Sequence, residues 1–180
     1  EIQSIFASAE LSWKNQLYLT VTGRNDWDSK LAFSKQKSFF YPSVGLSALL
    51  SEMVKLPEVI SYAKIRGSYT VVASSFDRFL TNPGYEYNSQ THNWANPTVY
   101  PMDNMKPEKT KSWEIGLNLK FWGNRFNLDA TYYRSNTLNQ TFKVDIPSSS
   151  GYKQAIVQAG NVQNQGIELA LGFSDKWAGF

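Results

Sequence analysis

The sequence has no cysteine and a single histidine, His92. Disulfide frameworks, cysteine-based metal sites and cysteine nucleophiles are therefore excluded, and a zinc site is not expected. No apolar run reaches the ~18 residues of a transmembrane helix, so the sequence predicts none. The net charge of +3 comes without a basic run, which gives no support for nucleic-acid binding. The chain opens without the basic head and cleavage site of a signal peptide, so we expect the start of an exported protein to lie elsewhere.

Sequence motifs of the common enzyme classes are also missing. The chain contains no phosphate-binding loop, no HExxH string and no nucleophile elbow. Glu108 and Glu114 share one segment, but their spacing does not indicate an acid/base pair. We therefore expect no enzymatic activity, no cofactor and no metal.

Aromatic residues are abundant, at 15% of the chain, with 6 Trp and 10 Tyr. Tryptophan and tyrosine suit positions with one apolar side and one wet side, such as the interfacial girdles of membrane proteins. The mean hydropathy of -0.41 argues against a helical membrane protein. It is compatible with a β-barrel, because barrel strands are apolar on only one face.

Alternation of apolar and polar residues with a period of two is the dominant pattern, and it predicts an all-β fold. Seven predicted strands cover residues 5–13, 17–27, 39–50, 64–71, 112–121, 126–133 and 167–173. Residues 51–62 have room for one helical turn, and no other helix is expected. Gly123 and Asn124 predict a tight turn between two of the strands.

Three features favour a transmembrane barrel over a soluble sandwich. The strands are close to the ~9–11 residues that cross a bilayer at a tilt. Short connections at 14–16 and 122–125 alternate with long ones at 28–37, 74–111 and 136–155, as expected for periplasmic turns and extracellular loops. Aromatic residues mark both ends of the apolar faces. At the short-turn end these are Trp13, Phe121, Trp122 and Phe173, and at the long-loop end Trp27, Trp113 and Tyr132.

The strand charges share the polar parity, which we expect to face the barrel lumen. They are Glu10, Arg24, Asp26, Lys64, Arg66, Glu114, Lys120, Asp129 and Glu168. Arg134 departs from this pattern, because it continues the apolar parity of Tyr132. We expect Arg134 to lie above the hydrocarbon layer, where a long side chain can reach water.

Five strings in order carry a resemblance to one family. They are TVTGRNDW, KSFFYPSVGLS, KPEKTKSWEIGL, ATYYRSNT and NVQNQGIELAL, at residues 20–27, 37–47, 106–117, 130–137 and 161–171. Together they resemble the SusC/RagA family of TonB-linked outer-membrane transporters. The resemblance implies one partial domain over residues 1–180, forming about seven strands of a large antiparallel transmembrane β-barrel with long extracellular loops. Barrels of this type have about 22 strands and a plugged lumen.

The resemblance also implies a function and partners. The family imports nutrients such as oligosaccharides or peptides across the outer membrane, with a SusD-like surface lipoprotein as a lid. Its energy comes through TonB, which binds a plug domain that does not occur in this sequence. Two alternatives stay open: a TonB-linked siderophore or signalling receptor, and a soluble all-β carbohydrate-binding module.

The loop at residues 74–111 is the candidate ligand region. Its aromatic residues are Phe76, Phe79, Tyr85, Tyr87, Trp94 and Tyr100, among many amides. We select Tyr85, Tyr87 and Trp94 as candidate substrate contacts, because flat rings beside amides suit sugars. The alternative is that these rings pack the loop against itself or a partner. A surface role is expected for His92.

Overall fold

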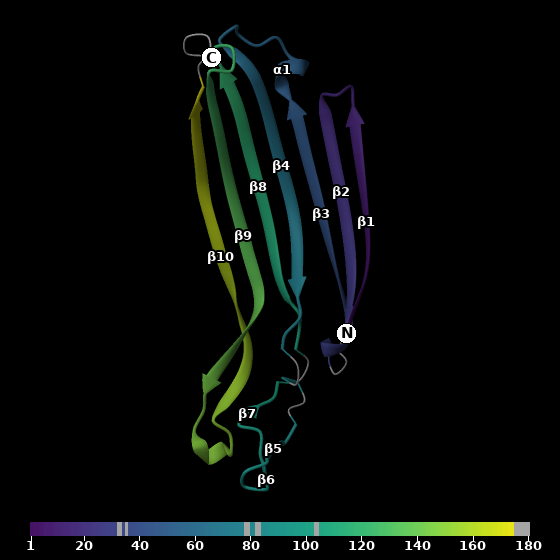
Figure 1. Ribbon diagram of the computed structural model, residues 1–180, viewed down its shortest axis with the longest axis vertical. Helices are drawn as coiled ribbons and strands as arrows, with labels where there is room; N and C mark the ends of the chain where they lie inside the picture. Colours follow the sequence, from purple (N-terminus) through teal and green to yellow (C-terminus); the bar gives the residue numbers. More distant parts are fainter. Residues whose placement is uncertain (32–33, 35, 78–79, 82–83, 103–104, 175–180) are drawn as a thin grey trace.

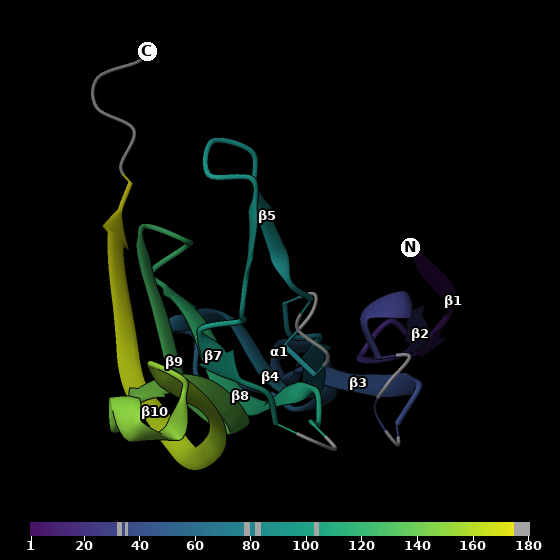
Figure 2. The same cartoon turned by 90° about the horizontal axis from the view of Figure 1, so that it is seen from below.

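The computed structural model describes residues 1–31, 34, 36–77, 80–81, 84–102 and 105–174. Seven long strands form one antiparallel wall in chain order (Figure 1). They are β1 (Ile2–Trp13), β2 (Leu17–Asp28), β3 (Ser38–Leu49), β4 (Ile60–Ser74), β8 (Glu108–Phe121), β9 (Phe126–Asp145) and β10 (Gln154–Phe173). Seen along its long axis, the wall curves like part of a cylinder (Figure 2).

Small elements complete the fold. The loop after β4 carries β5 (Glu86–Asn88), β6 (Asn93–Ala95) and β7 (Val99–Tyr100), and β5 and β6 form a separate two-stranded sheet. The single predicted helical turn is confirmed as α1 (Leu50–Met53). Two 3-10 turns, η1 (Ser29–Leu31) and η2 (Ser148–Ser150), lie in other connections. No helix in the described ranges is long and apolar enough to cross a membrane.

The prediction of seven long strands is confirmed, but β1, β4, β8, β9 and β10 are longer than predicted, and the difference is largest for β9 and β10. β9 and β10 have 20 residues each and pair from Phe126↔Phe173 to Asp145↔Gln154. The prediction of a long connection over residues 136–155 is therefore wrong, since only residues 146–153 separate the two strands. Apolar alternation stops near Arg134, beyond which both faces are largely polar, so the hydropathy pattern could not reveal a ladder that backbone hydrogen bonds continue.

The short turns have the backbone geometry of tight hairpins. Lys14 and Asn15, between β1 and β2, have φ of 51° and 54°. Gly123 and Asn124, between β8 and β9, have φ of 65° and 70°. Positive φ at two successive residues matches the twist of the flanking strands, which is why glycine and asparagine are favoured there.

The strand register gives the wall two chemically different faces. An apolar row in mid-wall consists of the cross-strand partners Ile65, Leu117, Ala130 and Leu169. The neighbouring row on the other face consists of Arg66, Gly116, Thr131 and Glu168. We assign the polar face to the lumen, because a cation facing lipid at mid-bilayer destabilises a barrel by ~2–4 kcal/mol. Below, "inward" and "outward" denote the polar and apolar parity.

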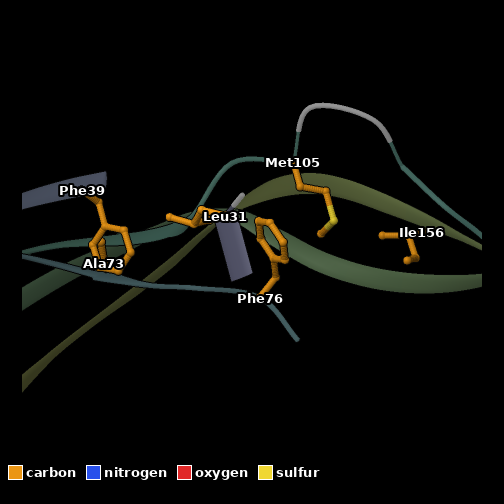
Figure 3. Packing of buried hydrophobic residues seen from close by; sticks show 6 residues of the cluster. All are labelled: Leu31, Phe39, Ala73, Phe76, Met105 and Ile156. Carbon is orange, nitrogen blue, oxygen red and sulfur yellow. The ribbon is translucent and has the colours of Figure 1, made fainter. Parts of the chain in front are cut away.

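A small core lies at the long-loop end and not within the wall. Leu31, Phe39, Ala73, Phe76, Met105 and Ile156 form one buried cluster (Figure 3). These residues come from the connection after β2, three strands and both ends of the loop after β4. Their burial ties the long connections to the wall, since each large buried aliphatic or aromatic side chain contributes about 1.5–3 kcal/mol.

Candidate ligand-binding end of the wall

The hairpin β5–β6 presents the predicted contact residues. Tyr87 and Trp94 are cross-strand partners, with ring centroids 5.1 Å apart and planes inclined by 54°. Tyr85 immediately precedes the hairpin. The exposed fractions are 66% for Tyr85, 50% for Tyr87 and 68% for Trp94, so all three rings are open to contact. Figure 2 shows β5 projecting toward the concave side of the wall.

Polar contacts define the turn of this hairpin. The Asn88 side-chain oxygen accepts hydrogen bonds from the backbone N–H groups of Gln90 (2.9 Å) and Thr91 (3.1 Å). His92 adopts a φ of 53°, and its Nδ1 lies 3.2 Å from the Tyr87 hydroxyl oxygen. His92 is exposed, as expected, and it also holds the Tyr87 ring in place, a contact that the sequence did not indicate.

Two other loop aromatics make packing contacts. Phe76 is buried in the core at the long-loop end. Tyr100 meets Tyr152 edge-on, with ring centroids 5.1 Å apart. Phe79 lies outside the described residues. Phe76 is thus a core residue, and Tyr100 is 53% exposed while it contacts a different connection, whereas Tyr85 and Trp94 keep about two thirds of their surface exposed.

Two contacts anchor the loop to β10. The Gln158 side-chain amide donates to the Lys106 carbonyl at 2.6 Å and accepts from the Lys106 N–H at 2.7 Å. Val99 and Tyr100 of β7 pair in parallel with Gln154 and Ala155. Both contacts lie on the C-terminal side of the hairpin, and on its N-terminal side the loop is held by the buried Phe76.

An ion-pair network crosses the inward face near mid-wall. Arg66 on β4 reaches Asp129 on β9, with nitrogen–oxygen distances of 3.1 and 3.2 Å, and donates to the Thr131 hydroxyl at 2.7 Å. Asn118 donates to the same carboxylate at 3.1 Å. Because β8 separates the partners, Arg66 must pass over Gly116. The polar parity predicted the face of these charges, but not their pairing.

A second polar group lies nearer the long-loop end. Arg24 pairs with Asp26 at 2.8 Å and donates to the Ser4 hydroxyl at 3.0 Å. The Tyr41 hydroxyl donates to the Asp26 carboxylate. The inward face therefore offers fixed charges and hydroxyls along its height. In the part of the chain that the structure describes, no group of three or more acids or histidines is arranged to hold a metal ion.

A family model described as "TonB dependent receptor-like, beta-barrel" matches residues 1–180. The chain belongs to this family. Members of the TonB-dependent receptor family are outer-membrane proteins, so the wall lies in the outer membrane. The alternative of a soluble carbohydrate-binding module is therefore wrong.

Curated relatives agree with the family assignment. TonB-dependent receptor P39 of Formosa agariphila is 25% identical over 94% of this chain and 17% of its own length. TonB-dependent receptor SusC of Bacteroides thetaiotaomicron is 26% identical over 93% of this chain and 18% of its own length. The chain thus spans less than a fifth of these TonB-dependent receptors.

Solved structures share the fold. The RagAB peptide importer in its "closed-closed" state superposes with a TM-score of 0.83 at 19% identity, over 99% of this chain and 20% of that one. The siderophore receptor PirA from Pseudomonas aeruginosa gives 0.65 at 15% identity, over 93% of this chain and 30% of that one. Both confirm the prediction of a partial wall of a TonB-dependent receptor barrel.

Proposed function

We propose that this wall belongs to a TonB-dependent importer that carries oligosaccharides or peptides across the outer membrane without covalent chemistry. The resemblance to SusC/RagA transporters supports this substrate class, as does the similarity to SusC and to the RagAB peptide importer. A SusD-like surface lipoprotein acts as the lid over the extracellular loops. TonB supplies energy through a plug domain in the lumen.

The observation that carries the proposal is the exposed aromatic hairpin on the concave side of the wall. Tyr85, Tyr87 and Trp94 offer flat apolar faces beside Asn88 and Asn93. Rings of this kind stack on sugar rings and on the apolar parts of peptides, while amides bind their hydroxyl or backbone groups. The hairpin forms the first contact, and the polar inward face lines the path that follows.

The first prediction concerns Trp94 in the complete receptor. We expect Trp94→Ala to weaken binding of the imported oligosaccharide or peptide by about tenfold, because a stacked ring contributes roughly 1–2 kcal/mol. Phe142→Ala is the matched control, since Phe142 is an exposed ring of outward parity at the same end. Isothermal titration with glycan and peptide panels measures both variants, and uptake by cells follows the same order.

The result separates the alternatives. Binding of a ferric siderophore and no glycan or peptide would establish the siderophore receptor instead. Equal binding by the Trp94 and Phe142 variants would show that the hairpin does not contact the ligand, and it would not contradict the importer function.

A further inference from the structure

The outward face changes character abruptly toward the long-loop end. Its last fully apolar row includes Ile115, Tyr132 and Ile167. The next row places Trp113 beside Arg134, and the Trp113 and Tyr132 rings lie 5.3 Å apart. These rings mark the upper edge of the apolar band, because amphipathic aromatics gather at the bilayer interface.

Three cations follow directly above this edge. Arg134 is the first, and Lys111 and Lys109 continue the outward parity of β8. Arg134 and Lys111 are diagonal neighbours on adjacent strands, which places their Cα atoms about 7–8 Å apart. Lys109 lies two residues further along, about 7 Å from Lys111. The three cations therefore form one row about 14 Å long on the outward face.

In the described part of the wall, no acid of outward parity lies beside these cations. Their outward neighbours in the register are the buried Val71 and Ala73 of β4, Asn136 and Leu138 of β9, and Asn161, Gln163 and Gln165 of β10. Glu108 and Glu114, the acids of β8, have the inward parity. Within the described residues the ion pairs are Arg24–Asp26 and Arg66–Asp129, so the three cations have no anionic partner.

On the β9–β10 side of the cations, most of the neighbouring side chains are hydrogen-bonding amides. Arg134 donates from Nη2 to the Gln163 side-chain oxygen at 2.7 Å, which holds the guanidinium over β10. Asn136 donates to Asn161 at 2.9 Å. Lys111 is exposed. The patch is therefore a cationic surface with amide neighbours directly above an aromatic girdle.

We propose that Lys109, Lys111 and Arg134 bind the phosphate groups of an outer-leaflet lipid. Lipid phosphates lie immediately outside the hydrocarbon layer, the level at which these cations follow the Trp113–Tyr132 girdle. Cations just beyond an apolar band attract anionic headgroups, and arginine adds directed hydrogen bonds to phosphate oxygens. The amides accept and donate hydrogen bonds to the remaining polar headgroup, while the acyl chains lie on the apolar rows below.

The test uses the complete receptor, purified in detergent, and a monophosphorylated lipid A as the probe. We expect Lys109→Gln/Lys111→Gln/Arg134→Gln to weaken binding of this lipid by roughly tenfold or more, since each cation near the headgroup adds attraction. The control is Lys64→Gln/Lys120→Gln/Lys143→Gln, which removes the same charge from the inward parity. A heat-modifiability gel shift checks that both variants are folded barrels.

Several outcomes decide the proposal. Selective loss in the outward variant, with dephosphorylated lipid binding weakly to the wild type, supports it. Equal binding by both variants, or equal binding of phosphorylated and dephosphorylated lipid, overturns it. Displacement of the lipid by millimolar inorganic phosphate also overturns it, because the patch would then be a general anion site and not a lipid site.

Discussion

Single residues in the wall act by making room as well as by making contacts. A Cβ atom at Gly116 would lie 2.5 Å from Nε and 2.7 Å from Cζ of Arg66. Glycine at this position therefore lets the guanidinium cross β8 and reach Asp129 on β9. Such a crossing joins three strands through one side chain on the inward face.

Substitution of Gly116 by alanine tests this crossing. We expect Gly116→Ala to lower the free energy of unfolding of the complete barrel by about 1–3 kcal/mol, because Arg66 must move and Asp129 loses its partner. Gly45→Ala is the matched control, since a Cβ there meets nothing within 4 Å. Urea unfolding followed by tryptophan fluorescence compares the two, and equal stability would show that Arg66 adjusts freely.

At the scale of elements, one of the contacts that hold the loop after β4 is a side-chain amide of β10. The Gln158 side chain hydrogen-bonds both the N–H and the C=O of Lys106, as a neighbouring strand would. A side chain that satisfies both groups fixes the backbone next to the buried Met105. Contacts outside the aromatic hairpin therefore help to fix its position.

Loss of that amide should loosen the loop without unfolding the wall. We expect Gln158→Ala to raise the rate of chymotrypsin cleavage in residues 84–102 by about tenfold, because the two hydrogen bonds from Gln158 to the loop, roughly 1 kcal/mol each, are lost. Gln154→Ala serves as the control, since the Gln154 side chain bonds Asp145 within the same β-hairpin. Mass spectrometry locates the cuts, and equal rates would mean that β7 alone holds the loop.

The sequence predicted the long strands better than the loop. Alternation identified the seven strands because one face must be apolar wherever lipid contacts the wall. It failed above Arg134, where β9 and β10 continue with polar residues on both faces. The hairpin β5–β6 is three residues long on each side, too short for any period to be read.

The candidate site was predictable by residue type and not by geometry. Exposed Tyr85, Tyr87 and Trp94 agree with the choice of contact residues, which stays a prediction until binding is measured. The Tyr87–His92 contact and the Arg66–Asp129 pair join residues whose spacing in sequence carries no signal. Only the strand register brings Arg66 and Asp129 close together.

At the scale of the whole molecule, the outward face requires an apolar surrounding. Leu169 and Leu171 are exposed by 69% and 84%, and they face away from the polar parity. In an outer-membrane barrel this surface is covered by acyl chains. The stability of the wall in the membrane therefore depends on keeping charge off this face at mid-height.

A charge-scanning pair measures this dependence. We expect Leu169→Arg to destabilise the complete barrel by ~2–4 kcal/mol in lipid, because the guanidinium faces hydrocarbon. Ala170→Arg is the control, since Ala170 has the inward parity and is the cross-strand partner of Asp129. Guanidinium unfolding in liposomes gives both values, and equal losses would mean that the two faces are wrongly assigned.

The parallel pairing of β7 with β10 also constrains the order in which the protein assembles. Val99 pairs with Gln154, 55 positions later in the chain, and the Thr98 carbonyl accepts from Lys153 at 2.8 Å. The docking place of the loop is therefore built by strands that are synthesised after it. Contacts between distant residues form slowly, because their chain closure costs entropy first. The aromatic hairpin is accordingly among the last parts of the chain to reach its final position. A receptor that is only partly assembled in the membrane therefore has its lipid-facing surface before its ligand-binding end is ordered.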